Sequence, residues 1–213
     1  MIEDSSHTTG LLARAGQGDQ QSLQELFGQH RERLKRMVRL RLSRRLQGRI
    51  DDSDVLQESL LEISRKLKDY VQNPEVPFFL WLRQMTGHKL AELHRRHLGT
   101  QMRDADREVS IYCGALPEAN SVSLAVHLLG QLTSPSQAAI KAEMRLRLQE
   151  ALDNLDPLDR EVIALRHFEQ LSGDETAAVL GLSKTGASSR YVRAINRLRK
   201  SLSQFPEFAD LKK

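Results

Sequence analysis

The stretch LSGDETAAVLGLSKTGASSRYVRAINRLRKSL, residues 171–202, decides the fold of the C-terminal part of the chain. Ser172, followed three residues later by Glu175, is typical of a capping box that starts a helix. The turn Gly181–Ser183 follows this helix, and Ser183 is suited to cap the next one. Two helices joined by so short a turn predict a helix-turn-helix.

The second of these helices has an apolar face and a basic polar face. Its inward positions are Ala187, Tyr191, Ala194, Ile195, Leu198 and Leu202. Its outward positions carry short polar residues first and arginines later: Thr185, Gly186, Ser189, Arg190, Arg193, Asn196 and Arg197. No acidic residue occurs between Lys184 and Gln204, so this face suits the base edges and phosphates of a DNA major groove. A helical hairpin with a basic, solvated face is the alternative.

The composition extends the helical prediction to the whole chain. Its 213 residues are 39% hydrophobic, 28% charged and only 5% aromatic, and the sequence is rich in strong helix formers. This indicates an all-α protein with two small helical domains joined by a long linker. The predicted parts are a flexible tail 1–10, a first domain 11–98, a linker 99–135 with one short helix, a second domain 136–202 and a tail 203–213.

Charge, cysteine content and the N-terminal sequence limit the possible partners and the cellular compartment. The net charge of +4 is compatible with a polyanionic partner but weak evidence by itself. The one cysteine, Cys113, excludes an internal disulfide and is expected to be a small, partly buried residue. The first ten residues lack an apolar signal segment and no stretch is apolar enough for a membrane helix, so we expect a cytoplasmic protein without membrane insertion.

The segment Asp54–Val71 is predicted to form a helix with two distinct faces. Its core face carries Leu56, Leu60, Ile63, Leu67 and Tyr70. Its opposite face carries Asp54, Gln57, Glu58, Leu61 and Arg65, so Leu61 is an apolar residue within a polar stripe. This face is either ordinary solvated surface or an acidic docking surface for a basic helical partner.

The segment Phe78–His97 is predicted to form another helix, with Phe78, Leu82, Met85 and Leu93 buried. Its expected outward face consists of Arg83, Gly87, His88, Ala91, His94 and Arg95. Small residues flanked by cations let a helix approach a phosphate backbone closely. Trp81 lies between the two faces and is either an edge of the core or a stacking platform for an unpaired base.

Two other patterns in the sequence bear on function. The spacing of His88, His94 and His97 does not put three imidazoles on one helix face, so no metal site is predicted. The run Arg31–Arg49 is strongly basic but keeps an apolar stripe, and it predicts a folded basic helix. That helix is either a nucleic-acid contact or a charged face that balances the acidic residues 51–54.

Taken in order along the chain, these motifs resemble the extracytoplasmic-function (ECF) sigma factors of the sigma-seventy family. Residues 52–58, DSDVLQE, resemble the region 2 motif that docks on the largest polymerase subunit. Residues 79–82, FLWL, with the basic pair Arg95 and Arg96, resemble the helix that contacts the minus-10 element. Residues 155–162, LDPLDREV, and the helix-turn-helix resemble region 4, the minus-35 reader. The chain departs from the family at 185–188, TGAS, where a Gly-Thr-Val-Lys type of run is common, and in its longer linker.

The resemblance implies a sigma factor that binds core RNA polymerase, recognises the minus-10 and minus-35 elements and promotes DNA melting. The implied polymerase contacts are Asp54, Gln57, Glu58 and Leu61. The implied minus-10 contacts are Trp81, Arg83, His88, His94, Arg95 and Arg96. The implied minus-35 contacts are Lys184, Thr185, Ser188, Ser189, Arg190, Arg193 and Arg197. The implied partners are core polymerase, promoter DNA, and an anti-sigma factor or another regulator.

Two other classes of protein fit the sequence less well. A helix-turn-helix regulator would bind DNA alone as a dimer, but nothing in the sequence supplies a ligand pocket or the symmetry of an operator reader. The chain contains no glycine-rich phosphate loop, nucleophile motif or metal-ligand spacing. The sequence therefore predicts neither an enzyme nor a bound cofactor.

Overall fold

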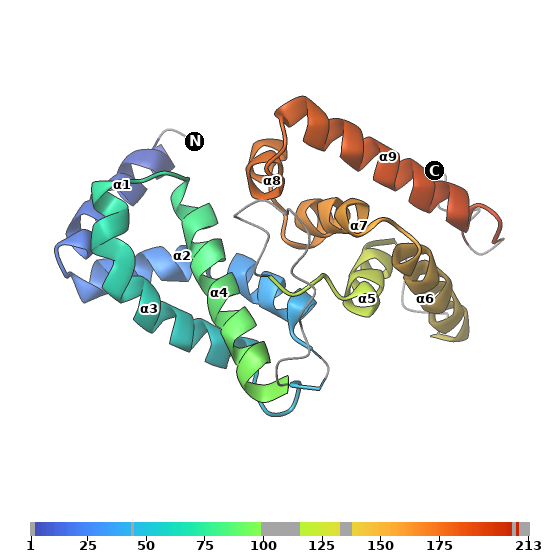
Figure 1. The fold of residues 1–213 in the computed structure, drawn as a ribbon, viewed down its shortest axis with the longest axis horizontal. Coiled ribbons are helices and arrows are strands. Elements are labelled where there is room, and N and C mark those ends of the chain that lie inside the picture. Colours follow the sequence, from blue (N-terminus) through green and yellow to red (C-terminus); the bar gives the residue numbers. More distant parts are fainter. Residues whose placement is uncertain (1–2, 44, 99–115, 133–137, 206–207, 209–213) are drawn as a thin grey trace. The chain divides into compact units, whose positions relative to one another are not determined.

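The computed structural model of the protein describes residues 3–43, 45–98, 116–132, 138–205 and 208. All regular elements within these residues are helical, which confirms the all-α prediction. The elements are α1 Glu3–Gly16, α2 Gln20–Arg41, α3 Asp52–Gln72, α4 Phe78–Leu98, α5 Ser121–Leu132, α6 Ala138–Asp153, α7 Pro157–Ile163, the π-helix η1 Ala164–Phe168, α8 Gly173–Leu180 and α9 Lys184–Leu202. Contacts divide the chain into two compact units, one built around α1 to α4 and one around α5 to α9 (Figure 1). No helix in the described parts is both long and apolar enough to cross a membrane.

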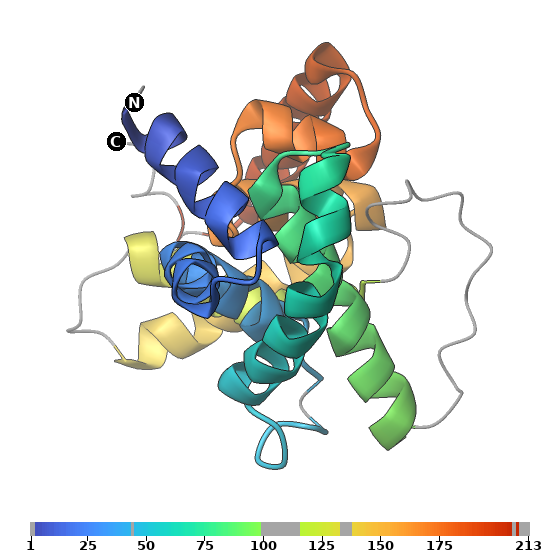
Figure 2. The same ribbon diagram turned by 90° about the vertical axis from the view of Figure 1, so that its left-hand side faces the viewer.

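The core of the first unit lies between α3 and α4, which pack side by side (Figures 1 and 2). The predicted core residues Leu56, Ile63 and Leu67 of α3 are buried, as are Leu82 and Met85 of α4. Because these apolar residues leave water together, their burial is the main force that holds the two helices in contact.

The N-terminal residues differ from the expected flexible tail. Residues 3–10 form the first turns of α1, so that prediction is wrong for them. Leu11 and Ala15, one turn apart, are buried, and α1 packs on α3. The contact is close, since a Cβ on Gly16 would lie 3.2 Å from Cγ2 of Val71. The buried pair anchors the helix, and the polar residues before it continue the same helix.

The basic run is helical over only part of its predicted length. Helix α2 ends at Arg41, and a turn-rich loop connects it to α3. The backbone N–H of Ser43 donates to His94 Nε2 of α4 at 3.3 Å, in place of a helical carbonyl. Gly48 has a φ of 95°, which a helix does not allow. Asp51 then starts α3, and its carboxylate accepts the Asp54 N–H at 2.8 Å.

The second unit contains the predicted helix-turn-helix, α8 and α9. The capping box is confirmed, because Ser172 Oγ accepts the Glu175 N–H and Glu175 accepts the Ser172 N–H. Gly181 ends α8 in the left-handed conformation, with a φ of 64°. Ser183 Oγ accepts the Gly186 N–H at 3.0 Å, which confirms the predicted cap of α9. Helix α9 packs against α6, α7 and α8.

The linker and the C-terminal tail contribute to the second unit. Helix α5, the short helix expected within the linker, packs against α6 and η1, so this unit begins before the predicted boundary at residue 136. At the other end, Arg147 lies 4.9 Å from the centre of the Phe205 ring, and Phe208 is buried. Cys113 and the rest of 99–115 lie outside the described residues.

Candidate functional site

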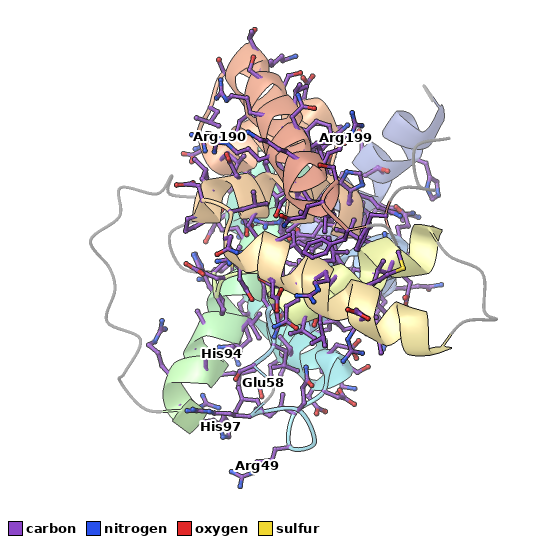
Figure 3. All side chains as sticks on the ribbon, turned by 90° about the vertical axis from the view of Figure 1, so that its right-hand side faces the viewer. Arg49, Glu58, His94, His97, Arg190 and Arg199 are labelled. Atoms are coloured by element: carbon purple, nitrogen blue, oxygen red, sulfur yellow. The ribbon has the colours of Figure 1, made fainter. Side chains whose placement is uncertain are left out.

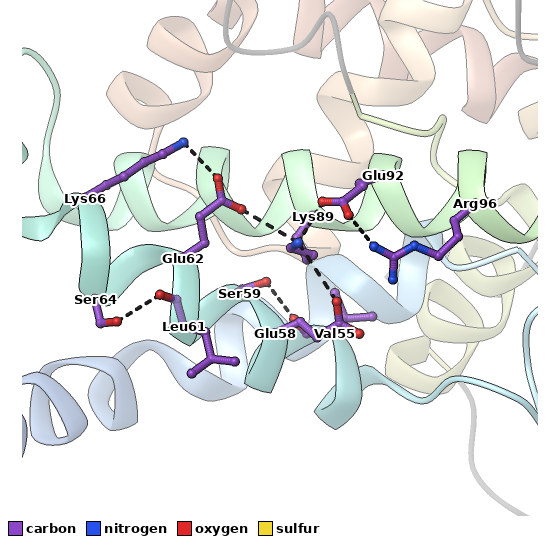
Figure 4. A network of polar contacts seen from close by, with 10 residues as sticks. All are labelled: Val55, Glu58, Ser59, Leu61, Glu62, Ser64, Lys66, Lys89, Glu92 and Arg96. Atoms are coloured by element: carbon purple, nitrogen blue, oxygen red, sulfur yellow. Dashed lines mark hydrogen bonds and ion pairs between the residues drawn. The ribbon is translucent and has the colours of Figure 1, made fainter.

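The predicted docking face of α3 is accessible. We call Asp54, Gln57, Glu58 and Leu61 the α3 surface. Asp54 and Gln57 are exposed, and the Glu58 side chain is 43% exposed. Leu61 is 63% exposed and points away from α4 (Figure 4). An apolar side chain this exposed, beside carboxylates, is chemically suited to bind a partner with both apolar and basic groups.

A lysine from α4 lies beside the α3 surface. Lys89 Nζ is 2.7 Å from Glu92, but 3.9 Å from both Glu58 and Glu62 (Figure 4). One ammonium group therefore faces three carboxylates, and its closest partner is not on α3. The neighbouring depression has a volume of about 380 Å³ and is lined by Glu58, Leu61, Glu62, Arg65, Lys66 and Lys89. Glu58 keeps much of its negative charge available to a partner.

Asp54 has a second role that the sequence analysis missed. Its carboxylate accepts the Asp51 N–H at 3.0 Å and so completes the capping box of α3. A substitution at Asp54 would change the start of the helix as well as the α3 surface. Gln57, Glu58 and Leu61 are therefore the cleaner positions for testing this surface.

The outward face of α4 differs from the expected one. Arg83 and His94 are only 1% and 2% exposed, and Gly87 and Ala91 are also buried, so their predicted outward placement is wrong. Helical periodicity predicts one buried stripe, whereas most of the circumference of α4 is buried. The accessible stripe consists of the partly exposed Trp81 and Gln84 and the exposed His88 and Arg95. Trp81, His88 and Arg95 recur every seven residues, which puts them on one line of the helix.

His94 holds the loop between α2 and α3 in place. Its Nε2 accepts the Ser43 N–H, which requires that nitrogen to be unprotonated. Burial lowers the pKa of His94 below its usual value, which favours the same neutral form. Figure 3 shows His94 and His97 on α4 at the end of the unit where Arg49 of the loop also lies. The role of His94 that the structure supports is thus a structural one.

This arrangement predicts a dependence of stability on pH. The unfolded chain protonates His94 near its ordinary pKa of 6.5, whereas the folded chain resists protonation. The contribution of His94 to the free energy of unfolding is therefore complete above pH 6.5. It is lost as the pH falls from there towards the lowered pKa of the folded chain. A His94→Gln variant keeps an acceptor for the Ser43 N–H and does not titrate. Its melting temperature should fall less between about pH 7.5 and about pH 5.5 than that of the wild type, and an equal fall would contradict the assignment.

Trp81 belongs to an aromatic cluster beside the loop 73–77. Its ring stacks on Tyr70 with centroids 4.6 Å apart, and the Phe78 ring lies 5.9 Å away. The Tyr70 hydroxyl donates to the carbonyl of Val76 at 2.8 Å, which ties the loop to α3. One face of the indole is therefore held by protein, while the side chain remains partly exposed. Such a held ring is suited to stack on an unpaired base.

The start of α9 presents an open polar surface. Lys184, Thr185, Ser188, Ser189 and Arg193 are all exposed. Lys184 forms a 2.7 Å ion pair with Asp174, but both side chains are well exposed, so the pair is weak. Arg193 makes no ion pair with the residues that the structure describes. The short side chains of Thr185, Ser188 and Ser189 lie in the first two turns of the helix, as short polar side chains do in helices that read a major groove.

The predicted line of three arginines is split. Arg190 Nη1 lies 2.7 Å from Asp159 Oδ1, and Arg197 Nη1 contacts Asp159 Oδ2. The two arginines therefore point towards α7, whereas Arg193 does not. Arg190 and Arg199 lie on opposite sides of α9 (Figure 3). A buried carboxylate on α7 thus pairs with Arg190 and Arg197, and the contact of the three arginines with DNA stays a prediction.

Neither Asp159 nor Lys89 was identified from the sequence. Asp159 lies 31 residues before Arg190 and 38 before Arg197, so no local spacing connects them.

Among the described residues, no group of three or more histidine, cysteine, aspartate or glutamate side chains could hold a metal ion.

Comparison with known proteins places these features in a family. The family model described as "Sigma-70, region 4" matches residues 145–198, which include α7, η1, α8 and most of α9. The ECF RNA polymerase sigma factor SigD of Mycobacterium tuberculosis is 28% identical over 209 residues, covering 98% of this chain and 90% of SigD. ShbA, an ECF RNA polymerase sigma factor of Streptomyces griseus, is 29% identical over 205 residues, covering 93% of this chain and 97% of ShbA.

A solved structure has a similar fold along almost the whole chain. It is titled "Structure of CnrH in complex with the cytosolic domain of CnrY", and it matches with a TM-score of 0.55 and 24% identity over 93% of this chain and 99% of that one. CnrH of Cupriavidus metallidurans is an RNA polymerase sigma factor. Residues 145–198 thus match region 4 of the sigma-70 proteins, and along nearly its whole length the chain is similar to the ECF sigma factors of the sigma-70 family.

Proposed function

We propose that this chain binds core RNA polymerase, recognises the minus-35 and minus-10 elements of promoters and promotes DNA melting. The observation that carries the proposal is the region 4 match over α7 to α9, where the start of α9 is exposed and polar. The similarity to ECF sigma factors over nearly the full chain supports extending the proposal to the first unit. The proposed activity makes and breaks no covalent bond.

In this proposal the α3 surface anchors the protein on polymerase. Leu61 would enter an apolar site on the partner, and Asp54, Gln57 and Glu58 would meet basic and polar groups around it. Charge complementarity would speed the encounter, and the buried apolar contact would slow dissociation.

The start of α9 is proposed to read the minus-35 element. Thr185, Ser188 and Ser189 are short enough to reach base edges when the helix lies in the major groove. Lys184 and Arg193 would contact the flanking phosphates, because both are exposed. Arg190 and Arg197 lie at the margin of this surface, restrained by Asp159.

The accessible stripe of α4 is proposed to hold the minus-10 element as it melts. A base flipped from the non-template strand would stack on Trp81, beside the loop 73–77, while His88 and Arg95 contact the strand. Arg96 would assist from the last turn, although it also pairs with Glu92 at 2.6 Å. Extruding a base costs a few kcal/mol, which stacking worth about 1 to 3 kcal/mol helps to offset. Arg83 and His94 support the helix from within the unit.

A protein regulator such as an anti-sigma factor is a further proposed partner. The support is that CnrH, which is 28% identical to this chain over 190 residues, forms a complex with the cytosolic domain of CnrY.

The test of the proposed function is reconstitution with purified core polymerase. The full chain should co-purify with core polymerase, and the complex should enrich a common two-element sequence from a pool of randomised promoter fragments. It should then start transcription from the enriched fragments, which core polymerase alone should not do. Tight binding of the free chain to DNA as a symmetric dimer, unchanged by polymerase, would instead support the dimeric regulator.

The minus-35 proposal makes separate predictions for base and phosphate contacts. Arg193→Gln should weaken binding of the complex to all fragments and lower the salt slope by about one unit, because one phosphate contact is removed. Ser189→Ala should change the preference at one or two base pairs and leave the salt slope unchanged. Binding constants at several salt concentrations check both results. If Ser189→Ala changed no base preference, α9 would not be the reading helix.

A further inference from the structure

A buried carboxylate holds two arginines of the recognition helix. Asp159 lies in the first turn of α7, and its side chain is only 2% exposed. Each of its oxygens meets one guanidinium group: Oδ1 that of Arg190 and Oδ2 that of Arg197. Asp156, which caps α7, adds a second carboxylate 3.6 Å from Arg190.

The two arginines remain close to solvent even though their partner is buried. The side chain of Arg190 is 26% exposed and that of Arg197 is 59% exposed. They are seven residues apart, so they lie on one line of α9, and that line faces α7. Each arginine could contact a nearby phosphate only by leaving the Asp159 carboxylate. Because that carboxylate is shielded from water, its attraction for a guanidinium group is stronger than that of an exposed carboxylate.

Two other cations of α9 are held differently. Lys184 pairs only with an exposed carboxylate, which water and salt screen. Arg193 has no ion-pair partner within the described parts of the chain and is exposed. Helix α9 therefore carries two classes of cation: some are available to DNA and two are restrained.

Resting on the proposed minus-35 reading, we infer that Asp159 limits the sequence-independent affinity of α9 for DNA by keeping Arg190 and Arg197 away from DNA phosphates. A phosphate contact adds affinity for any sequence, whereas the contacts from Thr185, Ser188 and Ser189 depend on the bases. Withholding two phosphate contacts therefore lowers the affinity for promoter DNA and for other DNA by a similar factor. The preference that comes from the base contacts stays the same, while the binding itself is weaker and less dependent on salt with Asp159 than without it.

The test compares complexes of core polymerase with the wild-type or Asp159→Asn full chain. Asparagine keeps the size of the side chain and removes its charge. The probes are an enriched promoter fragment and the same fragment with its minus-35 element replaced. For Asp159→Asn we expect tighter binding to both fragments, an unchanged preference for the intact one, and a salt slope steeper by about one to two units. A purely structural role would weaken binding to both fragments without steepening the slope.

Arg197→Gln supplies the matched control, with Arg193→Gln as the reference for an arginine that does contact phosphate. Arg197→Gln alone should leave the salt slope unchanged, because Asp159 already withholds this side chain. In the Asp159→Asn background the same substitution should lower the slope by about one unit. If Arg197→Gln alone lowered the slope by one unit, the inference would be overturned, and this holds even if Asp159→Asn failed to fold.

The outcomes separate this inference from the proposed function. A wild-type complex that prefers the intact fragment, with an unchanged slope for folded Asp159→Asn, overturns only the role of Asp159. A wild-type complex that does not distinguish the two fragments overturns the minus-35 proposal and the inference together.

Discussion

Combined substitution of Glu58→Lys and Leu61→Arg should lower the affinity for core polymerase by roughly 100-fold, or about 3 kcal/mol. Leu61 is the most exposed large apolar residue of α3, and Glu58 keeps a carboxylate that Lys89 neutralises only from 3.9 Å. The variant replaces an apolar anchor and an anion with two cations, so a basic partner would be repelled as well as left without its contact. Titration of labelled core polymerase with each chain measures the effect.

The thermal stability of this variant should stay close to that of the wild type. Neither side chain caps a helix. The Glu58–Lys89 pair is long, at 3.9 Å, and the Glu58 side chain is 43% exposed, so the pair contributes at most about 1 kcal/mol. Asp54 is left unchanged, because its carboxylate belongs to the capping box of α3. Glu25→Lys, a charge reversal at an exposed site on α2, is the matched control and should bind polymerase normally. Equal affinity of the double variant and the control would remove the α3 surface from the polymerase interface.

The helix-turn-helix could be predicted because its signals are local. Ser172 and Glu175 are three residues apart, and Gly181 and Ser183 act on their own backbone and the next turn. Each signal works through a hydrogen bond or a backbone conformation that needs no distant partner. The structure reproduces all of them.

The face of α4 could not be predicted in the same way. Periodicity finds one buried stripe, but Arg83 and His94 lie outside the Phe78–Leu82 stripe and are buried as well. From sequence alone, a charged or titratable residue is predicted to be exposed unless its partner is known. For His94 that partner is the backbone N–H of Ser43, 51 residues away. The heptad spacing of Trp81, His88 and Arg95 was present in the sequence and would have identified the accessible stripe.

The arginines of α9 show the same limit. Their spacing correctly put Arg190 and Arg197 on one line of the helix. It could not show that this line faces α7. The residue that decides the orientation, Asp159, is separated from α9 by the whole of η1 and α8. The basic face consequently contains two arginines that pair with a buried carboxylate, which the sequence did not indicate.

Trp81→Ala should leave the closed promoter complex largely intact and reduce DNA opening by roughly 30-fold, or about 2 kcal/mol. The indole is held from one side by Tyr70 and stays partly exposed, so it offers a ready surface to a flipped base. Without it, the cost of extruding the base is no longer offset by stacking. Permanganate reactivity of thymines near the start site measures opening, and fragment binding at low temperature measures the closed complex.

Two controls separate stacking from general damage to the first unit. Trp81→Phe keeps an aromatic face against Tyr70 and should retain most of the opening, because stacking tolerates any aromatic ring. A promoter fragment with a preformed bubble should restore transcription by Trp81→Ala, because the base no longer has to be extracted from a duplex. A chain with a disordered first unit would fail on the bubble as well. Normal permanganate reactivity with Trp81→Ala would show that the loop 73–77 and its aromatic cluster are only a connector between α3 and α4.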